Sequence, residues 1–156
     1  MTGDGNGSPL GVRWGPHMTV GFDELDADHA SIIEALNALV EAHDRHLGRD
    51  QVDRLFDALM STVLGHFARE ERVMAESGYP GLSYHAGEHQ RLRQRLEQLQ
   101  AGEIHETDET MRADVRAFLT NWLYGHVLVD DFAYRGHLHD SDADVHALLA
   151  QPVTPG

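Results

Sequence analysis

The sequence contains no cysteine and no lysine, and it has no long apolar run. Without cysteine there can be no disulfide, and any bound metal must be held by nitrogen and oxygen ligands rather than by thiolates. No stretch approaches the roughly 18 consecutive apolar residues of a membrane span. Basic residues are few: the sequence has 12 arginines and 26 acidic residues, which gives a formal net charge of −14. This charge argues against a nucleic-acid backbone or an anionic membrane surface as a partner.

A length of 156 residues suits one domain with one sizeable core. We interpret residues 1–13 as a flexible polar arm, residues 14–135 as the folded domain, and residues 136–156 as a tail with room for one short helix. Residues 1–9 lack the basic and apolar regions of a signal peptide, so we expect a cytoplasmic protein. We also expect a monomer, and the sequence identifies no protein partner.

Apolar residues recur at helical spacing in four segments, and no segment shows the alternation of a strand. Asp23 suits a helix start, and Gly48 and Pro80 lie in the turns that separate the first three segments. Four such helices joined by short loops predict an all-α, up-down-up-down antiparallel four-helix bundle. The expected helices cover about residues 23–44, 51–76, 82–100 and 111–134, with a short additional helix at 141–149.

Histidines and carboxylates interrupt the apolar stripe of every expected helix. His66 and Glu70 lie one turn apart on one helical face, and so do His85 and His89. Burial of an ionised carboxylate is costly without a cation beside it, so these positions suggest a metal. In an antiparallel bundle the polar positions of all four helices fall near the same end. The candidate ligands are His29, His66, Glu70, His85, His89, His126 and either Asp130 or Asp131.

A single histidine on an apolar face is more often a satisfied core residue than a ligand. Seven polar residues from four helices at one level are better explained by coordination, because each would otherwise be buried at a cost. Their number exceeds the needs of one metal ion, which favours two metals bridged by the carboxylates. Imidazole and carboxylate without sulfur suit iron, although manganese and zinc also accept these ligands. The Glu-x-x-His pattern of ferritin-like sites is missing, which argues against that class.

Over about residues 14–135 the chain resembles the hemerythrin family, in particular the bacterial single-domain hemerythrins, in the order and spacing of four motifs. The motifs are Leu25-Asp26-Ala-Asp-His29, His66-Phe-Ala-Arg-Glu70-Glu, His85-Ala-Gly-Glu-His89 and Trp122-Leu-Tyr-Gly-His126-Val-Leu-Val-Asp-Asp131-Phe-Ala-Tyr134.

The resemblance implies a ligand assignment for two non-haem iron ions. His85, His89 and His126 would hold one iron, and His29 and His66 the other. Glu70 and Asp131 would bridge the two ions together with an oxo or hydroxo group. Helical spacing alone favours Asp130 as the partner of His126, so a ligand role for Asp131 implies a widened helical turn.

The resemblance also implies a function. Dioxygen would bind at the iron with fewer imidazoles, and Trp122, Leu123 and Val127 would line an apolar oxygen pocket, although simple core packing accounts for these three residues equally well. The protein would then be an oxygen carrier, store or sensor rather than an enzyme. The alternatives are a di-iron redox enzyme that reduces peroxide or nitric oxide, and an iron-storage or regulatory module.

Three glycines lie beside ligand positions inside the expected helices, where each costs about 1 kcal/mol relative to alanine. They are Gly65, Gly87 and Gly125. One hypothesis is that their missing side chains open a path for small molecules to the site. Close helix packing or a tolerated surface glycine explains them equally well.

Overall fold

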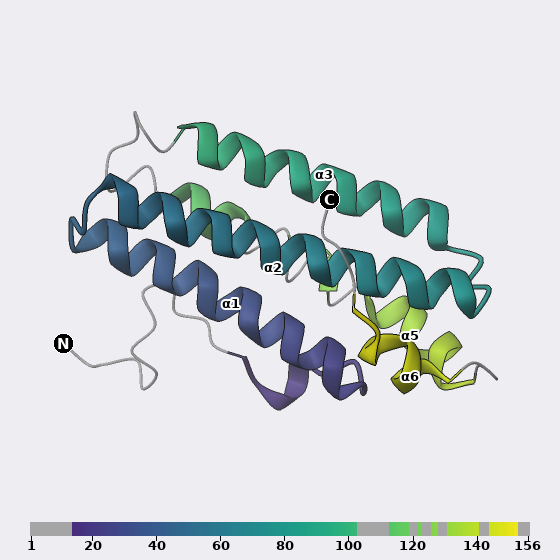
Figure 1. The fold of residues 1–156 in the computed structure, drawn as a ribbon. Helices are drawn as coiled ribbons and strands as arrows, with labels where there is room; N and C mark the ends of the chain where they lie inside the picture. Colours follow the sequence, from purple (N-terminus) through teal and green to yellow (C-terminus); the bar gives the residue numbers. More distant parts are fainter. Residues whose placement is uncertain are drawn as a thin grey trace.

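A computed structural model describes residues 14–102, 113–118, 122, 126–127, 131–140 and 144–152. Three long helices lie side by side and alternate in direction (Figure 1). The described residues include no strand, which confirms the predicted all-α bundle. The long helices are α1 (Asp23–Asp44), α2 (Arg49–Glu76) and α3 (Leu82–Gly102).

Two tight turns connect the long helices. Gly48, just before α2, has a φ of +94°, and Gly78, just after it, has a φ of +70°. Glycine adopts this left-handed region without the steric cost that a Cβ would add. The observed bounds of α2 and α3 lie within two residues of the predicted 51–76 and 82–100. These turns therefore bring α1, α2 and α3 together in the predicted antiparallel order.

The fourth predicted helix is described in part. Residues 113–118 and Trp122 are helical, and His126, Val127 and Asp131 have the wider π-helical conformation. Val115 and Phe118 pack into the same core as α1 and α2. Met111, at the expected start of this helix, lies outside the described residues.

The apolar interior consists of two separate clusters. The main cluster is the larger and fills the bundle from α1 to the fourth helical segment, with members such as Ile32, Val63, Leu92 and Trp122. The end cluster is smaller and lies where α1 begins and α2 ends. It contains Val20, Phe22, Leu25, Val73, Met74, Tyr134, Leu138, Val145 and Leu149.

Two short helices, α5 (Phe132–His139) and α6 (Val145–Ala150), lie at this end of the bundle (Figure 1). The predicted helix at 141–149 is observed as α6, which begins later because the Asp144 side chain caps it by accepting a hydrogen bond from the Ala147 N–H at 3.1 Å. Helix α6 packs against α2 and α1. The C-terminal segment thus docks on the bundle and completes the end cluster.

Candidate metal centre

The predicted ligand residues lie at one level of the bundle, between the main cluster and the end cluster. On α1, for example, His29 stands between Leu25 of the end cluster and Ile32 of the main cluster. On α2 the polar pair of His66 and Glu70 takes the same place. Seven of the predicted residues are brought together there, and each is at most 2% exposed: His29, His66, Glu70, His85, His89, His126 and Asp131.

One ligand group joins α1, α2 and the fourth helical segment. The Nε2 atoms of His29 and His66 are 3.0 Å apart, and His29 Nε2 lies 3.1 Å from Asp131 Oδ2. Glu70 Oε1 lies 3.9 Å from His29 Nε2 and contacts His66 Nε2. The potential ligand atoms of these four residues all lie within 4.8 Å of one another. A single metal ion could therefore contact all four residues.

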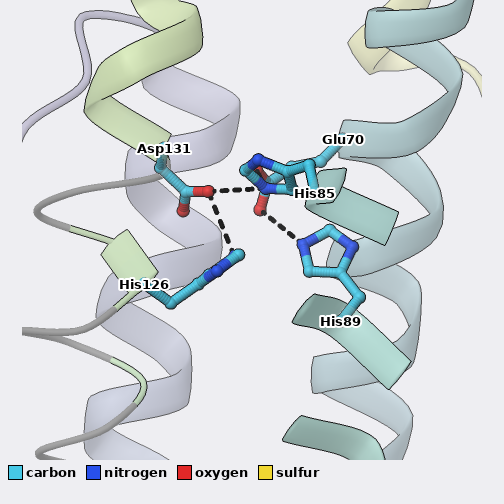
Figure 2. Close-up of side chains that lie close together, drawn as sticks. All are labelled: Glu70, His85, His89, His126 and Asp131. Carbon is cyan, nitrogen blue, oxygen red and sulfur yellow. Dashed lines mark ion pairs between the residues drawn. The ribbon is translucent and has the colours of Figure 1, made fainter. Parts of the chain in front are cut away.

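A second ligand group contains three imidazoles and the same two carboxylates (Figure 2). Asp131 Oδ1 lies 2.9 Å from His85 Nε2 and 3.2 Å from His126 Nε2. Glu70 Oε2 lies 3.4 Å from His85 Nε2, and Glu70 Oε1 lies 4.0 Å from His89 Nε2. Because Glu70 and Asp131 belong to both groups, the site is one continuous cradle for two cations.

Several buried polar atoms in this cradle make no hydrogen bond. They include both oxygens of Glu70, both oxygens of Asp131, and Nε2 of His85 and of His89. Some of them approach one another closely, but without hydrogen-bond angles. Buried polar atoms normally have partners, and an ionised carboxylate without one is costly. A pair of metal ions with nitrogen and oxygen ligands satisfies all of these atoms, so the residues fit a di-metal centre.

The π-helical turn explains how Asp131 reaches the centre. A π turn holds an extra residue, so side chains five residues apart, such as His126 and Asp131, can share a face. The widened turn implied by the family resemblance is therefore observed. Asp130, the alternative candidate, lies outside the described residues.

Opposite charges within the cluster shift its protonation equilibria strongly. Burial disfavours a charged imidazole, but the carboxylates of Glu70 and Asp28 outweigh it and raise the pKa of His66 to about 10. Asp131 and Glu70 overcome burial in the same way and raise the pKa of His85 to about 10. Burial also opposes ionisation of Glu70, yet the adjacent imidazoles, His66 above all, hold its pKa well below the usual range. The site thus stabilises positive charge. Protons and metal ions therefore compete for the same ligand atoms.

Two further carboxylates, which the sequence analysis did not identify, contact the outer nitrogens of the ligand histidines. Asp28 Oδ2 lies 3.0 Å from His66 Nδ1, and Glu71 Oε2 lies 2.8 Å from His89 Nδ1. Each is a sequence neighbour of a predicted ligand, so it projects about 100° away from the ligand face and escapes a search restricted to the apolar stripe. Adjacency to the ligand motifs was the available signal.

Aromatic and apolar side chains surround the centre. The Trp122 ring lies 5.7 Å from the His29 ring, and Phe67 stacks on His89 with ring centroids 3.9 Å apart. Trp122 and Val127 are buried, as expected for an oxygen pocket and equally for a packed core. Leu123, the third predicted lining residue, lies outside the described residues.

Comparison with known proteins agrees with this geometry. Residues 20–138 match the family described as the hemerythrin HHE cation binding domain. The chain belongs to the hemerythrin family. Hemerythrin domains bind a non-haem di-iron centre and dioxygen, and the buried cluster of histidines and carboxylates fits such a centre.

Curated hemerythrins from bacteria and an animal are similar over most of their length. The bacteriohemerythrin of Stenotrophomonas maltophilia is 33% identical over 125 residues, covering 78% of this chain and 77% of that protein. The myohemerythrin of Riftia pachyptila is 30% identical over 130 residues, covering 83% and 96%. A bacteriohemerythrin of Pseudomonas aeruginosa is 28% identical over 127 residues. The predicted family and the predicted iron cofactor are thereby confirmed.

In the described part of the chain, no helix combines the length and the apolar character that crossing a membrane requires.

Proposed function

We propose that this hemerythrin domain binds dioxygen reversibly and serves as an oxygen carrier, store or sensor. The observation that supports the proposal is the sharing of Glu70 and Asp131 between two ligand groups of unequal size. The larger group adds three imidazoles and the smaller adds two. In this proposal His85, His89 and His126 hold one iron, His29 and His66 hold the other, and Glu70 and Asp131 serve both.

The unequal groups determine where a small molecule could enter. If both irons shared the two carboxylates, His29 and His66 would give one iron a protein ligand fewer than His85, His89 and His126 would give the other. A small molecule would then be expected to bind on the side of His29 and His66. When bound, the pair of iron ions would supply the electrons that dioxygen binding requires.

The role of the surrounding side chains is to keep water and protons away from this position. Trp14 and Trp122 flank the His29 ring at 5.9 and 5.7 Å, and Phe67 covers His89. The two apolar clusters close the site from both directions along the bundle. Exclusion of water suppresses loss of the bound ligand by side reactions, which favours reversible binding over turnover. Leu123 stays a prediction as a third lining residue.

An absorption experiment tests the proposal. The iron-loaded protein is reduced without air, exposed to oxygen and then purged with argon. Reversible binding predicts a visible band that appears with oxygen and disappears on purging. Irreversible oxidation without a stable coloured adduct would contradict the proposal. Steady consumption of peroxide or nitric oxide in the presence of a reductant would favour the redox-enzyme alternative instead.

A further inference from the structure

The ring nitrogen of a metal-binding histidine that does not contact the metal usually donates a hydrogen bond to a neighbouring group. Its hydrogen-bond partner fixes the tautomer and the ring orientation, and an anionic partner makes the imidazole a stronger donor. His29, His66 and His89 differ in this respect. His66 donates to Asp28 and His89 to Glu71, whereas His29 Nδ1 has no hydrogen-bond partner among the described residues. Each proposed iron site therefore contains at least one histidine that is backed by a carboxylate among the described residues.

The carboxylate behind His66 is itself held from the other side. Arg69 donates from Nε to Asp28 Oδ2 at 2.8 Å and from Nη2 to Asp28 Oδ1 at 2.7 Å. This two-point contact fixes the plane of the carboxylate, because the guanidinium presents its donors in a rigid fork. Asp28 comes from α1, and His66 and Arg69 come from α2. The contact thus also ties the two helices together beside the centre.

The carboxylate behind His89 has a different environment. The Glu71 side chain is 38% exposed, compared with 16% for Asp28. Within the described residues, Glu71 forms an ion pair with His89 and with no arginine. The charge of Glu71 is therefore screened by solvent, whereas Asp28 is less exposed and is partly neutralised by Arg69. The two iron sites differ in their outer contacts as well as in their number of imidazoles.

We propose that Asp28 and Arg69 are positioning residues that act through His66 on the iron site expected to take dioxygen. Asp28 orients the His66 ring, keeps its proton on Nδ1, and directs the Nε2 lone pair toward the metal. Its negative charge strengthens donation by His66 and favours the oxidised iron. Arg69 holds Asp28 in place, and its positive charge partly neutralises the charge of Asp28. This inference rests on the proposed di-iron function.

Two substitutions should shift the reduction potential of the iron centre in opposite directions. Asp28→Asn keeps the size of the side chain and removes its charge, so the oxidised iron loses stabilisation and the potential rises. Arg69→Gln removes the neutralising charge, so the potential falls. The matched controls are Glu41→Gln and Arg45→Gln, which change the net charge equally at an exposed ion pair at the far end of α1, where Arg45 follows the last helical residue. Both controls should leave the potential unchanged.

A double variant distinguishes action through Asp28 from simple charge effects across space. If Arg69 acts through Asp28, Arg69→Gln should shift the potential much less in the Asp28→Asn background than in the wild type. Equal shifts in both backgrounds would overturn the proposed route. An unchanged potential in Asp28→Asn would overturn the proposal as a whole.

Cobalt(II) binding to the metal-free protein gives a readout that needs neither iron nor oxygen. Substitution of a residue behind a metal-binding histidine typically weakens metal binding by 10- to 100-fold. Asp28→Asn should therefore weaken cobalt binding by at least roughly tenfold, with Glu41→Gln as the control, and unchanged affinity would contradict the positioning role. If the wild-type protein binds no iron or no oxygen, the proposed function fails. If it binds both and the variants behave like wild type, only this inference fails.

Discussion

At the scale of single residues, Glu70 has the most demanding position in the molecule. Its carboxylate is fully buried, belongs to both ligand groups and has no hydrogen bond at either oxygen. A group in this position is tolerated when it is compensated by a cation. Its substitution should therefore affect both metal positions at once, unlike the loss of one histidine.

The Glu70→Gln variant should bind less than one iron per chain, compared with the two expected for the wild type. The amide keeps the size of the side chain but removes the charge and one of the shared ligand oxygens. Elemental analysis of the purified protein measures the effect, and Glu97→Gln on exposed α3 surface is the control. Two irons per chain in Glu70→Gln would contradict a bridging role.

The metal-free protein should lose stability as the pH rises from about 6.5 to 10. The pKa values of His66 and His85 are raised from 6.5 to about 10 in the folded state. Their stabilising contribution is thus fully present below pH 6.5 and is lost as the pH passes 10. Thermal denaturation should show a midpoint that falls by several degrees over this interval.

Metal loading should remove this pH dependence, because coordinated imidazoles are already neutral. A zinc-loaded sample, which has no redox chemistry, serves as the comparison. Equal pH profiles with and without metal would show that the buried imidazoles are not the cause.

Residue types and spacing were sufficient to predict six of the seven side chains that meet, all except Asp131, although their roles as ligands stay predictions. The choice between Asp130 and Asp131 came from family resemblance, because regular helical spacing favours Asp130 and a π turn leaves no reliable mark in a single sequence. Asp28 and Glu71 were missed for a related reason. They lie off the apolar face and become relevant only through the direction in which a ligand ring points.

At the scale of elements, one arginine of α2 contacts the end of helix α6. Arg72 donates to three carbonyl oxygens at the end of α6, those of Leu148, Gln151 and Pro152. The last carbonyls of a helix lack partners within the helix, so a guanidinium there acts as a C-terminal cap. Val145 and Leu149 bury the other side of α6 in the end cluster.

Arg72→Ala should loosen α6 and lower the free energy of unfolding by about 1–2 kcal/mol, since hydrogen bonds from a charged group are lost. Hydrogen exchange should report faster exchange of the α6 amides than in wild type. Arg45→Ala, at an exposed ion pair, is the control. Unchanged protection of α6 would mean that burial of Val145 and Leu149 alone holds the helix.

Gly87 offers a second test at this scale. A Cβ built on Gly87 meets no atom within 4 Å, so Gly87→Ala should raise stability by about 0.5–1 kcal/mol through the helix propensity of alanine. Denaturant unfolding measures this gain. If Gly87 also opens a path to the centre, oxygen association should slow, and unchanged rates would remove it from any such path.

The long helices α1, α2 and α3 were predictable because each has an apolar stripe and clear breaks at Gly48 and Pro80. The expected end of the fourth helical segment at residue 134 was wrong, because helical structure continues through α5 to His139. The sequence alone does not determine where the C-terminal segment docks, because the short pattern of residues 141–149 does not specify its partner. Its position is determined by contacts over a long separation in sequence, such as that between Arg72 and Leu148. Contacts of this kind depend on the assembled bundle rather than on local pattern.

At the scale of the whole molecule, a layer of polar ligands separates two apolar clusters. This arrangement explains how a chain with a net charge of −14 can bury two of its carboxylates, those of Glu70 and Asp131, near its centre. The two buried carboxylates need positive charge beside them, and the five imidazoles alone supply it only when they are protonated. Metal ions complete the structure in this account, so cofactor and fold stabilise each other.

The most direct test of this account is the stoichiometry of reversible oxygen uptake. An oxygen electrode measures uptake by the reduced, iron-loaded protein and release when the oxygen pressure is lowered, and elemental analysis gives the iron content. A reversible di-iron oxygen-binding protein should contain two irons per chain, take up one dioxygen per iron pair, and release it fully at low pressure. One iron per chain, or oxygen consumed without release, would contradict this account.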